Sequence, residues 1–289
     1  MPITSFGYGT DVGVSRDRNE DSLCVLPDIG LWVVADGMGG YKSGNIASRM
    51  TVEKLKDNIE KGLSLSESIA NIHHDILTAA GSDPEKKGMG STAVAMKTNG
   101  LNYEIAWVGD SRAYLWNGNT LKQITRDHSY VQDLLDKGVI DKKDVADHPQ
   151  RHAITQALGA EGLENVDVDV IYGIFYKNEK ILLCSDGLTG EVDDDQIASI
   201  LSDENSPQAA INRLIDTAKT NGGSDNITAI LISAPDDAKV KENSEITAPL
   251  KSETLIISNK QNPYPFVQWI IISILFLTII ILTVHLFYK

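Results

Sequence analysis

Apolar positions over residues 1–233 follow two spacings, and each spacing predicts a different kind of element. Short apolar runs between turn residues predict strands, two of them within 6–26 and others over 31–35, 91–96, 103–108, 112–116, 120–124, 167–175, 180–184 and 227–233. Apolar residues at helical spacing predict helices over 45–59, 65–79, 130–137, 153–158, 197–201 and 209–220. We expect the strands within 91–124 to form an antiparallel meander and those within 167–184 to pair with each other.

The pattern changes twice towards the C-terminus. Residues 235–262 are polar and predict a flexible linker, whereas 266–287 contain no Asp, Glu, Lys or Arg. A helix of that length is roughly 33 Å long, enough for a hydrocarbon layer of about 30 Å. We therefore predict a globular domain over 1–234, the linker, and a single membrane anchor over 263–289. No signal peptide is evident. Almost nothing follows the predicted anchor, so the globular domain is expected to stay on the side where it was made.

Composition excludes some classes of function. The net charge of −14 argues against non-specific binding to nucleic acid, which needs a basic surface. Cys24 and Cys184 have neither disulfide nor zinc-site spacing, so both are expected to be reduced, buried thiols. An acidic chain is compatible with a protein that gathers carboxylates around cations.

Three aspartates share one local pattern. Asp36, Asp186 and Asp225 each lie beside glycine at the end or start of a predicted strand. Each could be an ordinary turn residue. A shared site explains the repetition better, because acids packed together without a counter-ion repel each other and need a cation. Oxygen ligands without a Cys/His cluster favour Mg²⁺ or Mn²⁺ over zinc.

Further polar residues suggest what such a site could do. Glu20, Asp21 and Asp127 add carboxylates, more than one octahedral ion needs, so we predict two metal ions. Two ions about 4 Å apart can share a water molecule and lower its pKa, which makes it a nucleophile. The planar guanidinium of Arg16 is suited to hold a phosphate group beside them.

These residues belong to an ordered series of motifs within 4–233: Arg16…Glu20-Asp21, Asp36-Gly37-Met38-Gly39-Gly40, Gly88-Met89-Gly90-Ser91-Thr92, Gly109-Asp110-Ser111-Arg112, Asp127-His128-Ser129, Ser185-Asp186-Gly187 and Gly223-Ser224-Asp225-Asn226. In this order they closely resemble the bacterial branch of the metal-dependent protein serine/threonine phosphatases of type 2C. The resemblance implies an α+β fold, a four-layer sandwich of two antiparallel β-sheets flanked by helices. Here a C-terminal transmembrane helix would follow it.

The resemblance also implies the chemistry. Phosphoserine and phosphothreonine esters would be hydrolysed by a water held between Mg²⁺ or Mn²⁺ ions, without a phosphoenzyme. Carried over by position, Asp36 would bridge the two ions and the Gly37 carbonyl would serve the second. Asp186 and Asp225 would serve the first ion.

The remaining site residues have roles by the same resemblance. Glu20 and Asp21 would hold waters of the two ions, and Arg16 would bind the substrate phosphate. Asp127, together with Asp186, would form a weaker third metal site.

One position departs from the pattern of some relatives. Met38 stands where they carry a histidine that is a candidate acid for the leaving alkoxide. The leaving-group acid is therefore unassigned; a metal-bound water is the first hypothesis, and His128 and His152 are alternatives that we expect to be structural. Residues 129–151 match the variable flap beside the site.

The sequence thus predicts an active phosphatase at the cytoplasmic face of a bacterial cell membrane, attached by one C-terminal helix. Its partners would be phosphorylated Ser/Thr proteins and a cognate Ser/Thr kinase. Two alternatives are kept. One is a catalytically decayed, membrane-tethered module that binds phosphoproteins, and the other is a metal-dependent hydrolase of small phosphate esters.

Overall fold

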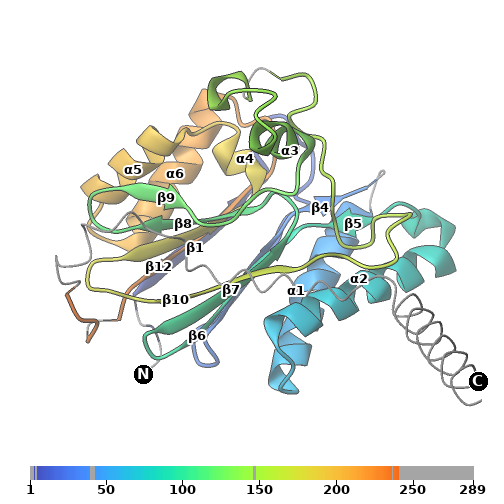
Figure 1. Cartoon of the computed structure of the whole chain (residues 1–289), viewed down its shortest axis with the longest axis horizontal. Helices are drawn as coiled ribbons and strands as arrows, with labels where there is room; N and C mark the ends of the chain where they lie inside the picture. Colours follow the sequence, from blue (N-terminus) through green and yellow to red (C-terminus); the bar gives the residue numbers. More distant parts are fainter. Residues whose placement is uncertain (1–2, 4, 40–42, 146–147, 236, 241–289) are drawn as a thin grey trace, which may run out of the picture. The chain divides into compact units, whose positions relative to one another are not determined.

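The computed structural model describes residues 3, 5–39, 43–145, 148–235 and 237–240. Two five-stranded antiparallel sheets form its centre (Figure 1). The first sheet has the order β1 (Phe6–Asp11), β12 (Ile227–Ser233), β11 (Lys180–Cys184), β8 (Arg112–Trp116) and β9 (Leu121–Gln123). The second has the order β10 (Asp169–Ile174), β7 (Asn102–Val108), β6 (Ala93–Asn99), β3 (Leu31–Ala35) and β2 (Ser22–Leu26).

Helices cover the outer face of each sheet. Against the second sheet lie α1 (Gly44–Glu60) and α2 (Leu65–Ser82), and against the first lie α4 (Asp186–Thr189), α5 (Asp194–Asp203) and α6 (Pro207–Asn221). Smaller elements are β4 (Gly37–Met38), β5 (Gly90–Ser91), α3 (Tyr130–Asp136) and two 3₁₀ turns, Pro84–Lys86 and Lys142–Asp144. The predicted sandwich of two sheets flanked by helices is confirmed.

Strand β3 shows why an uninterrupted apolar run suits this architecture. Trp32 and Val34 pack into the core between the two sheets, whereas Leu31, Val33 and Ala35 face the core under α1 and α2. All five side chains are fully buried. A strand covered on both faces needs apolar residues at every position rather than at alternate ones.

Two strand pairings predicted from the sequence are wrong. The strands within 91–124 do not form one meander, because β6 and β7 belong to the second sheet and β8 and β9 to the first. The chain crosses between the sheets at Gly109, whose φ of +106° a residue with a side chain rarely adopts. The predicted pair within 167–184 is likewise divided, since β10 pairs with β7 and β11 with β8 and β12.

The helix predicted over 153–158 is also wrong. Its backbone groups pair with distant segments instead: Thr155 N donates to His128 O, and Leu158 N donates to Ser91 O, both at 2.8 Å. A six-residue helix is marginal by itself because nucleation is costly, so these outside partners decide the conformation.

Two predictions concern residues beyond those described. The anchor predicted over 263–289 lies outside the described residues, and so does the linker over 235–262 except for residues 235 and 237–240. In the described part of the chain, none of the helices has the length and apolar character needed to cross a bilayer.

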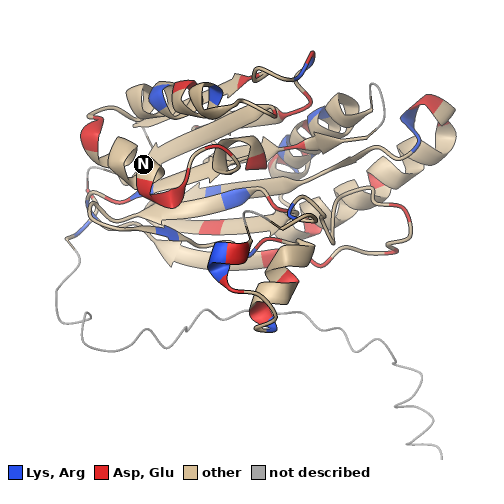
Figure 2. Cartoon of the chain, turned by 90° about the horizontal axis from the view of Figure 1, so that it is seen from above, with Lys and Arg blue, Asp and Glu red and all other residues tan. Residues whose placement is uncertain are grey.

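Acidic residues occur on many loops and helices of the described part of the chain (Figure 2).

Candidate active site

Five aspartates lie where strands of the two sheets begin or end. Asp36 follows β3, Asp21 precedes β2, Asp186 follows β11, Asp225 precedes β12, and Asp110 lies at the crossover from β7 to β8. Pairing of Ser22 with Ala35 brings the first two together, and pairing of Cys184 with Arg112 brings Asp186 towards Asp110. Acids far apart in the sequence therefore meet at one edge of the sandwich.

Close backbone contacts explain the glycines beside these acids. A Cβ added to Gly37 would lie 2.2 Å from the Gly44 carbonyl oxygen and 2.5 Å from that of Glu20. One added to Gly187 would lie 2.1 Å from the Asn226 carbonyl oxygen. No side chain fits at either position, so glycine lets the loops of different acids pack directly against one another.

Electrostatics shows how closely the acids act on each other. Burial, followed by the charges of the other four aspartates, raises the pKa of Asp36 well above its ordinary value. Burial also acts to raise the pKa of Asp186, but the contacts of His152 and Asp36 outweigh it and lower that pKa. The pKa of Asp36 therefore rises while that of Asp186 falls, as expected for two acids that share one space.

Asp21 and Asp110 are buried beside this pair. Burial raises the pKa of Asp21 to about 7 and that of Asp110 to about 8, and the charge of Asp186 adds to both shifts. Among the described residues, Asp21, Asp110 and Asp186 each have one buried carboxylate oxygen, Oδ1, without a hydrogen-bond partner. Buried polar atoms are rarely left unpaired, and orphaned carboxylate oxygens are what a hard divalent cation would ligate.

The oxygen-only donor set therefore fits Mg²⁺ or Mn²⁺. Within the described residues, no group of three or more His, Cys, Asp or Glu side chains is arranged to hold a metal ion. The charges of Asp186 and Asp225 both act on Asp36, so the three lie near one another, and their roles as ligands, with the Gly37 carbonyl, stay predictions.

Arg16 and Glu20 lie at the margin of the cluster. The Arg16 guanidinium donates from Nη2 to Asp225 Oδ2 at 2.7 Å, and half of its side chain is exposed (51%). Burial raises the pKa of Glu20, although Arg16 acts in the opposite direction. The backbone N–H of Glu20 donates to Asn226 Oδ1 at 2.8 Å, which ties the first acidic loop to the last.

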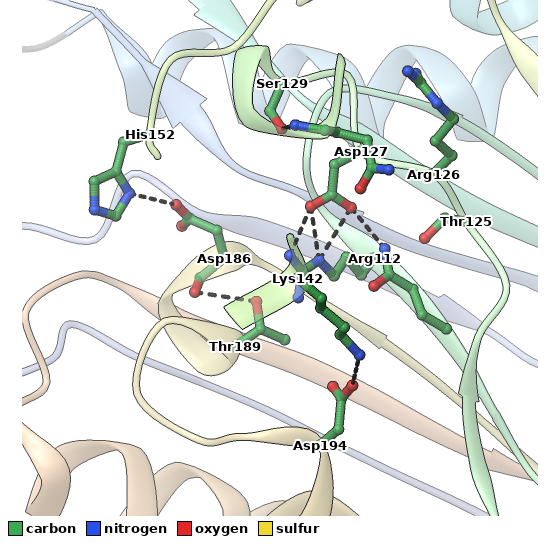
Figure 3. A network of polar contacts seen from close by, with 12 residues as sticks. Arg112, Thr125, Arg126, Asp127, Ser129, Lys142, His152, Asp186, Thr189 and Asp194 are labelled. Carbon is green, nitrogen blue, oxygen red and sulfur yellow. Dashed lines mark hydrogen bonds and ion pairs between the residues drawn. The ribbon is translucent and has the colours of Figure 1, made fainter. Parts of the chain in front are cut away.

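Asp127 is engaged with an arginine. Its buried carboxylate accepts from Arg112 Nε at 3.0 and 2.9 Å, from Arg112 Nη2 at 2.7 Å and from Gln123 Nε2 at 2.8 Å (Figure 3). Its charge also helps to raise the pKa of Asp110, so it lies within electrostatic reach of the cluster. Its role as a ligand of a third metal stays a prediction.

The two histidines differ in position. Buried His128 accepts from the Gly109 N–H at Nδ1, so Nε2 carries the proton that Asp169 accepts at 3.2 Å. That ring holds the crossover loop, a structural role. His152 is exposed, and its Nδ1 lies 3.8 Å from Asp186 Oδ2 (Figure 3).

Comparison with known proteins shows the family to which this chain belongs. The family model of protein phosphatase 2C matches residues 16–133. The serine/threonine phosphatase stp of Listeria welshimeri is 37% identical over 238 residues, which cover 78% of this chain and 94% of that protein. This chain belongs to the protein phosphatase 2C family.

Solved structures support the same assignment. Staphylococcus aureus Stp1, a serine/threonine phosphatase, matches with a TM-score of 0.75 at 34% identity, covering 81% of this chain and 98% of that one. The catalytic domain of the phosphatase PstP in complex with 2 manganese ions matches with a TM-score of 0.71 at 29% identity, covering 82% and 100%. The chain is thus a metal-dependent protein-serine/threonine phosphatase, and its cofactor is Mn²⁺ or Mg²⁺, as predicted.

Three residues at the site of this phosphatase had no metal-binding or phosphate-binding role predicted from the sequence: Asp110, Arg112 and His152. Only His152 enters the predictions at all, as an alternative leaving-group acid expected to be structural. Asp110 and Arg112 fall within a recurring motif, which was the available signal, but a lone Asp in a turn has no distinctive pattern of its own. His152 lies in an irregular polar segment, and only the fold brings it to Asp186.

The raised pKa values predict how the metal-free phosphatase responds to pH. Asp21 and Asp110 titrate near 3.8 when unfolded and at about 7 and about 8 when folded. Between about pH 4 and 8 the folded state binds more protons, so the free energy of unfolding falls as the pH rises. We expect the melting temperature in chelator to be several degrees lower at pH 8 than at pH 5.5.

Thermal melts at both pH values, with chelator and with Mn²⁺, test this expectation. Mn²⁺ should restore the loss at pH 8, and Asp110→Asn should reduce the pH dependence of the metal-free protein. A metal-free melting temperature that rises from pH 5.5 to pH 8 would contradict the assigned burial of these acids.

Proposed function

We propose that this phosphatase hydrolyses phosphoserine and phosphothreonine esters of proteins and so opposes one or more Ser/Thr kinases. The observation that carries the proposal is the cluster of five aspartates, three of them with an orphaned buried oxygen, beside an exposed arginine. A pair of divalent ions held there would supply a water molecule of lowered pKa as the nucleophile.

The residues of the chain have defined tasks in this proposal. Asp36, Asp186, Asp225 and the Gly37 carbonyl would hold the ions, and Asp21 and Glu20 would accept hydrogen bonds from waters around them. A bound cation would favour the ionised form of Asp36, because its positive charge would offset the mutual repulsion of the acids.

Arg16 is the proposed phosphate-binding residue. In the structure its guanidinium is paired with Asp225. If a cation engaged Asp225, the guanidinium would be free to donate two hydrogen bonds from its planar fork to phosphate oxygens. Breaking the ion pair between Arg16 and Asp225 should cost little free energy, because it is partly exposed and surface ion pairs contribute little to stability.

The leaving alkoxide also needs a proton. Met38 has no proton to give, and buried His128 is committed to Gly109 and Asp169. We therefore propose a water molecule of the site as the leaving-group acid.

The decisive experiment is hydrolysis of a phosphothreonine peptide by the full chain with and without Mn²⁺. We expect hydrolysis that depends on Mn²⁺ and is lost in Asp186→Asn. Full activity in Asp186→Asn would refute the proposed site. Binding of the peptide without turnover would favour a decayed binding module, and preference for small phosphate esters in competition would favour a general phosphoesterase.

We also propose that residues 263–289 attach the phosphatase to the cell membrane, with the catalytic domain in the cytoplasm. The support is the uncharged run over 266–287, which is long enough to span a bilayer. The full chain should sediment with membranes after alkaline carbonate washing, and protease added outside intact spheroplasts should leave the catalytic domain uncut. Extraction by carbonate alone would refute the anchor.

A further inference from the structure

Strand β10 is an edge of the second sheet, and among the described residues it pairs with β7 on one side only. Two of its side chains are large, apolar and exposed, Tyr172 at 66% and Ile174 at 51%. After Asp169 the strand carries no charged residue and no proline. A free edge of this composition can accept a further strand, and proteins usually protect such edges.

The other three edges of the two large sheets are protected. At β1, Tyr8 N donates to Gln208 Oε1 at 3.1 Å and Gln208 Nε2 donates to Tyr8 O at 2.9 Å, so a side chain occupies that edge. Strand β9 has only 3 residues, one of them the exposed Lys122. Every residue of β2 is at least partly buried. In the described part of the chain, β10 is therefore the edge that lacks a cover.

The last described residues lie close to the end of β10. Lys177, in the turn after this strand, donates from its backbone N–H to Lys239 O at 2.8 Å. Residues 241–262 follow, and their longest run of large apolar residues is Leu255-Ile256-Ile257. A flexible chain as long as 241–253 spans roughly 20 Å, and at most about 45 Å when extended. A strand of 6 residues such as β10 is about 20 Å long, so the apolar run can reach all of it.

We propose that residues 254–257 of this chain dock on the free edge of β10 as an added strand. The chain leaves the domain beside the C-terminal end of β10, so a segment that returns along the strand runs antiparallel to it. Its backbone would pair with the N–H and C=O groups of β10 that point away from β7, and its apolar side chains would cover Tyr172 and Ile174. The β-branched Ile256 and Ile257 favour the extended conformation that this pairing needs.

The tether favours this segment over a second copy of the chain. Through a short flexible connection its effective concentration at the edge is in the millimolar range, far above the concentration of the protein itself. Docking would shorten the free part of the predicted linker from 241–262 to 258–262. The proposed membrane anchor would then restrict the catalytic domain more closely than a linker that is flexible over its whole length. The inference does not depend on the proposed catalytic chemistry.

Hydrogen–deuterium exchange of the full chain in lipid nanodiscs tests the proposal, read residue by residue by mass spectrometry. The variant Leu255→Ser/Ile257→Ser removes two apolar side chains of the run. We expect the β10 amides that point away from β7 to exchange at least about tenfold faster in this variant than in the parent, because pairing shields them from water. The melting temperature should stay unchanged, since both substitutions lie outside the two sheets.

A matched control is Ile246→Ser/Leu250→Ser, which removes two apolar side chains from the same polar stretch outside the run. Its β10 amides should exchange at the parent rate. The reciprocal variant is Ile174→Lys, which places a charge on the edge at a half-exposed position. It should speed exchange of the amides of residues 254–257.

Three results would overturn the inference. The first is equal exchange of the β10 amides in the parent and in Leu255→Ser/Ile257→Ser. The second is equally accelerated exchange in the control Ile246→Ser/Leu250→Ser, which would show a general effect of linker composition. The third is protection of β10 that falls as the protein is diluted, which would show that a second copy of the chain covers the edge.

Discussion

Asp36→Asn is expected to lower kcat on a phosphothreonine peptide by more than about 100-fold, the upper range for residues that only orient metal ligands. The charges of four other aspartates act on Asp36, namely Asp21, Asp186, Asp110 and Asp225. Asparagine has nearly the same shape but carries no charge, so the ions would lose the carboxylate that we propose bridges them. Activity assays over a wide range of Mn²⁺ concentrations measure the effect.

Stability separates this result from misfolding. Burial and the neighbouring aspartates already disfavour a charge on Asp36, so Asp36→Asn should leave the melting temperature in chelator unchanged or slightly raised. The increase in melting temperature that Mn²⁺ causes in the parent protein should be lost. An Asp36→Asn protein that is active and fully stabilised by Mn²⁺ would refute the role of this carboxylate.

Arg16→Ala is expected to lower kcat/KM by about 100-fold, the effect of removing one donor that stabilises charge in the transition state. Arg16→Lys should recover part of this loss, because it restores the charge but not the planar fork. The measurement is steady-state kinetics on a phosphothreonine peptide at saturating Mn²⁺.

Exposure provides the control for Arg16. The side chain is half exposed and its ion pair with Asp225 is a surface contact, so the melting temperature should change by no more than a few degrees. Arg49→Ala, an exposed arginine on α1, should change neither activity nor stability. Unchanged kcat/KM in Arg16→Ala would place phosphate binding on another residue.

Both predictions depend on strand ends that meet in the folded chain, and the local sequence predicts this arrangement only in part. Elements with a strong pattern were predicted correctly, and 112–116, 180–184 and 227–233 correspond residue for residue to β8, β11 and β12. Their partners were predicted only in part: β8 pairs with β9 as expected, but β11 pairs with β8 and β12 rather than with β10. Strand pairing is a contact between distant segments, and equally apolar strands offer many pairings of similar local quality.

For the acids in the loops, too, the sequence identified candidate residues but not their contacts. The order of the motifs identified Asp36, Asp186 and Asp225 as candidates and correctly indicated the family and the cofactor. Neither the pairing of Asp127 with Arg112 nor the proximity of His152 to Asp186 has a sequence signal, because each joins segments that meet only when the two sheets pack.

By itself, the sequence of this phosphatase determined the type of most elements, the family and the uncharged C-terminal run, because periodicity, turn residues and ordered motifs are local properties. Only the tertiary structure decided that β7 and β8 belong to different sheets, with Asp110 buried at their crossover. The reason is physical: burial and mutual repulsion shift the acids of the site, and both arise only when separate strand ends share one space.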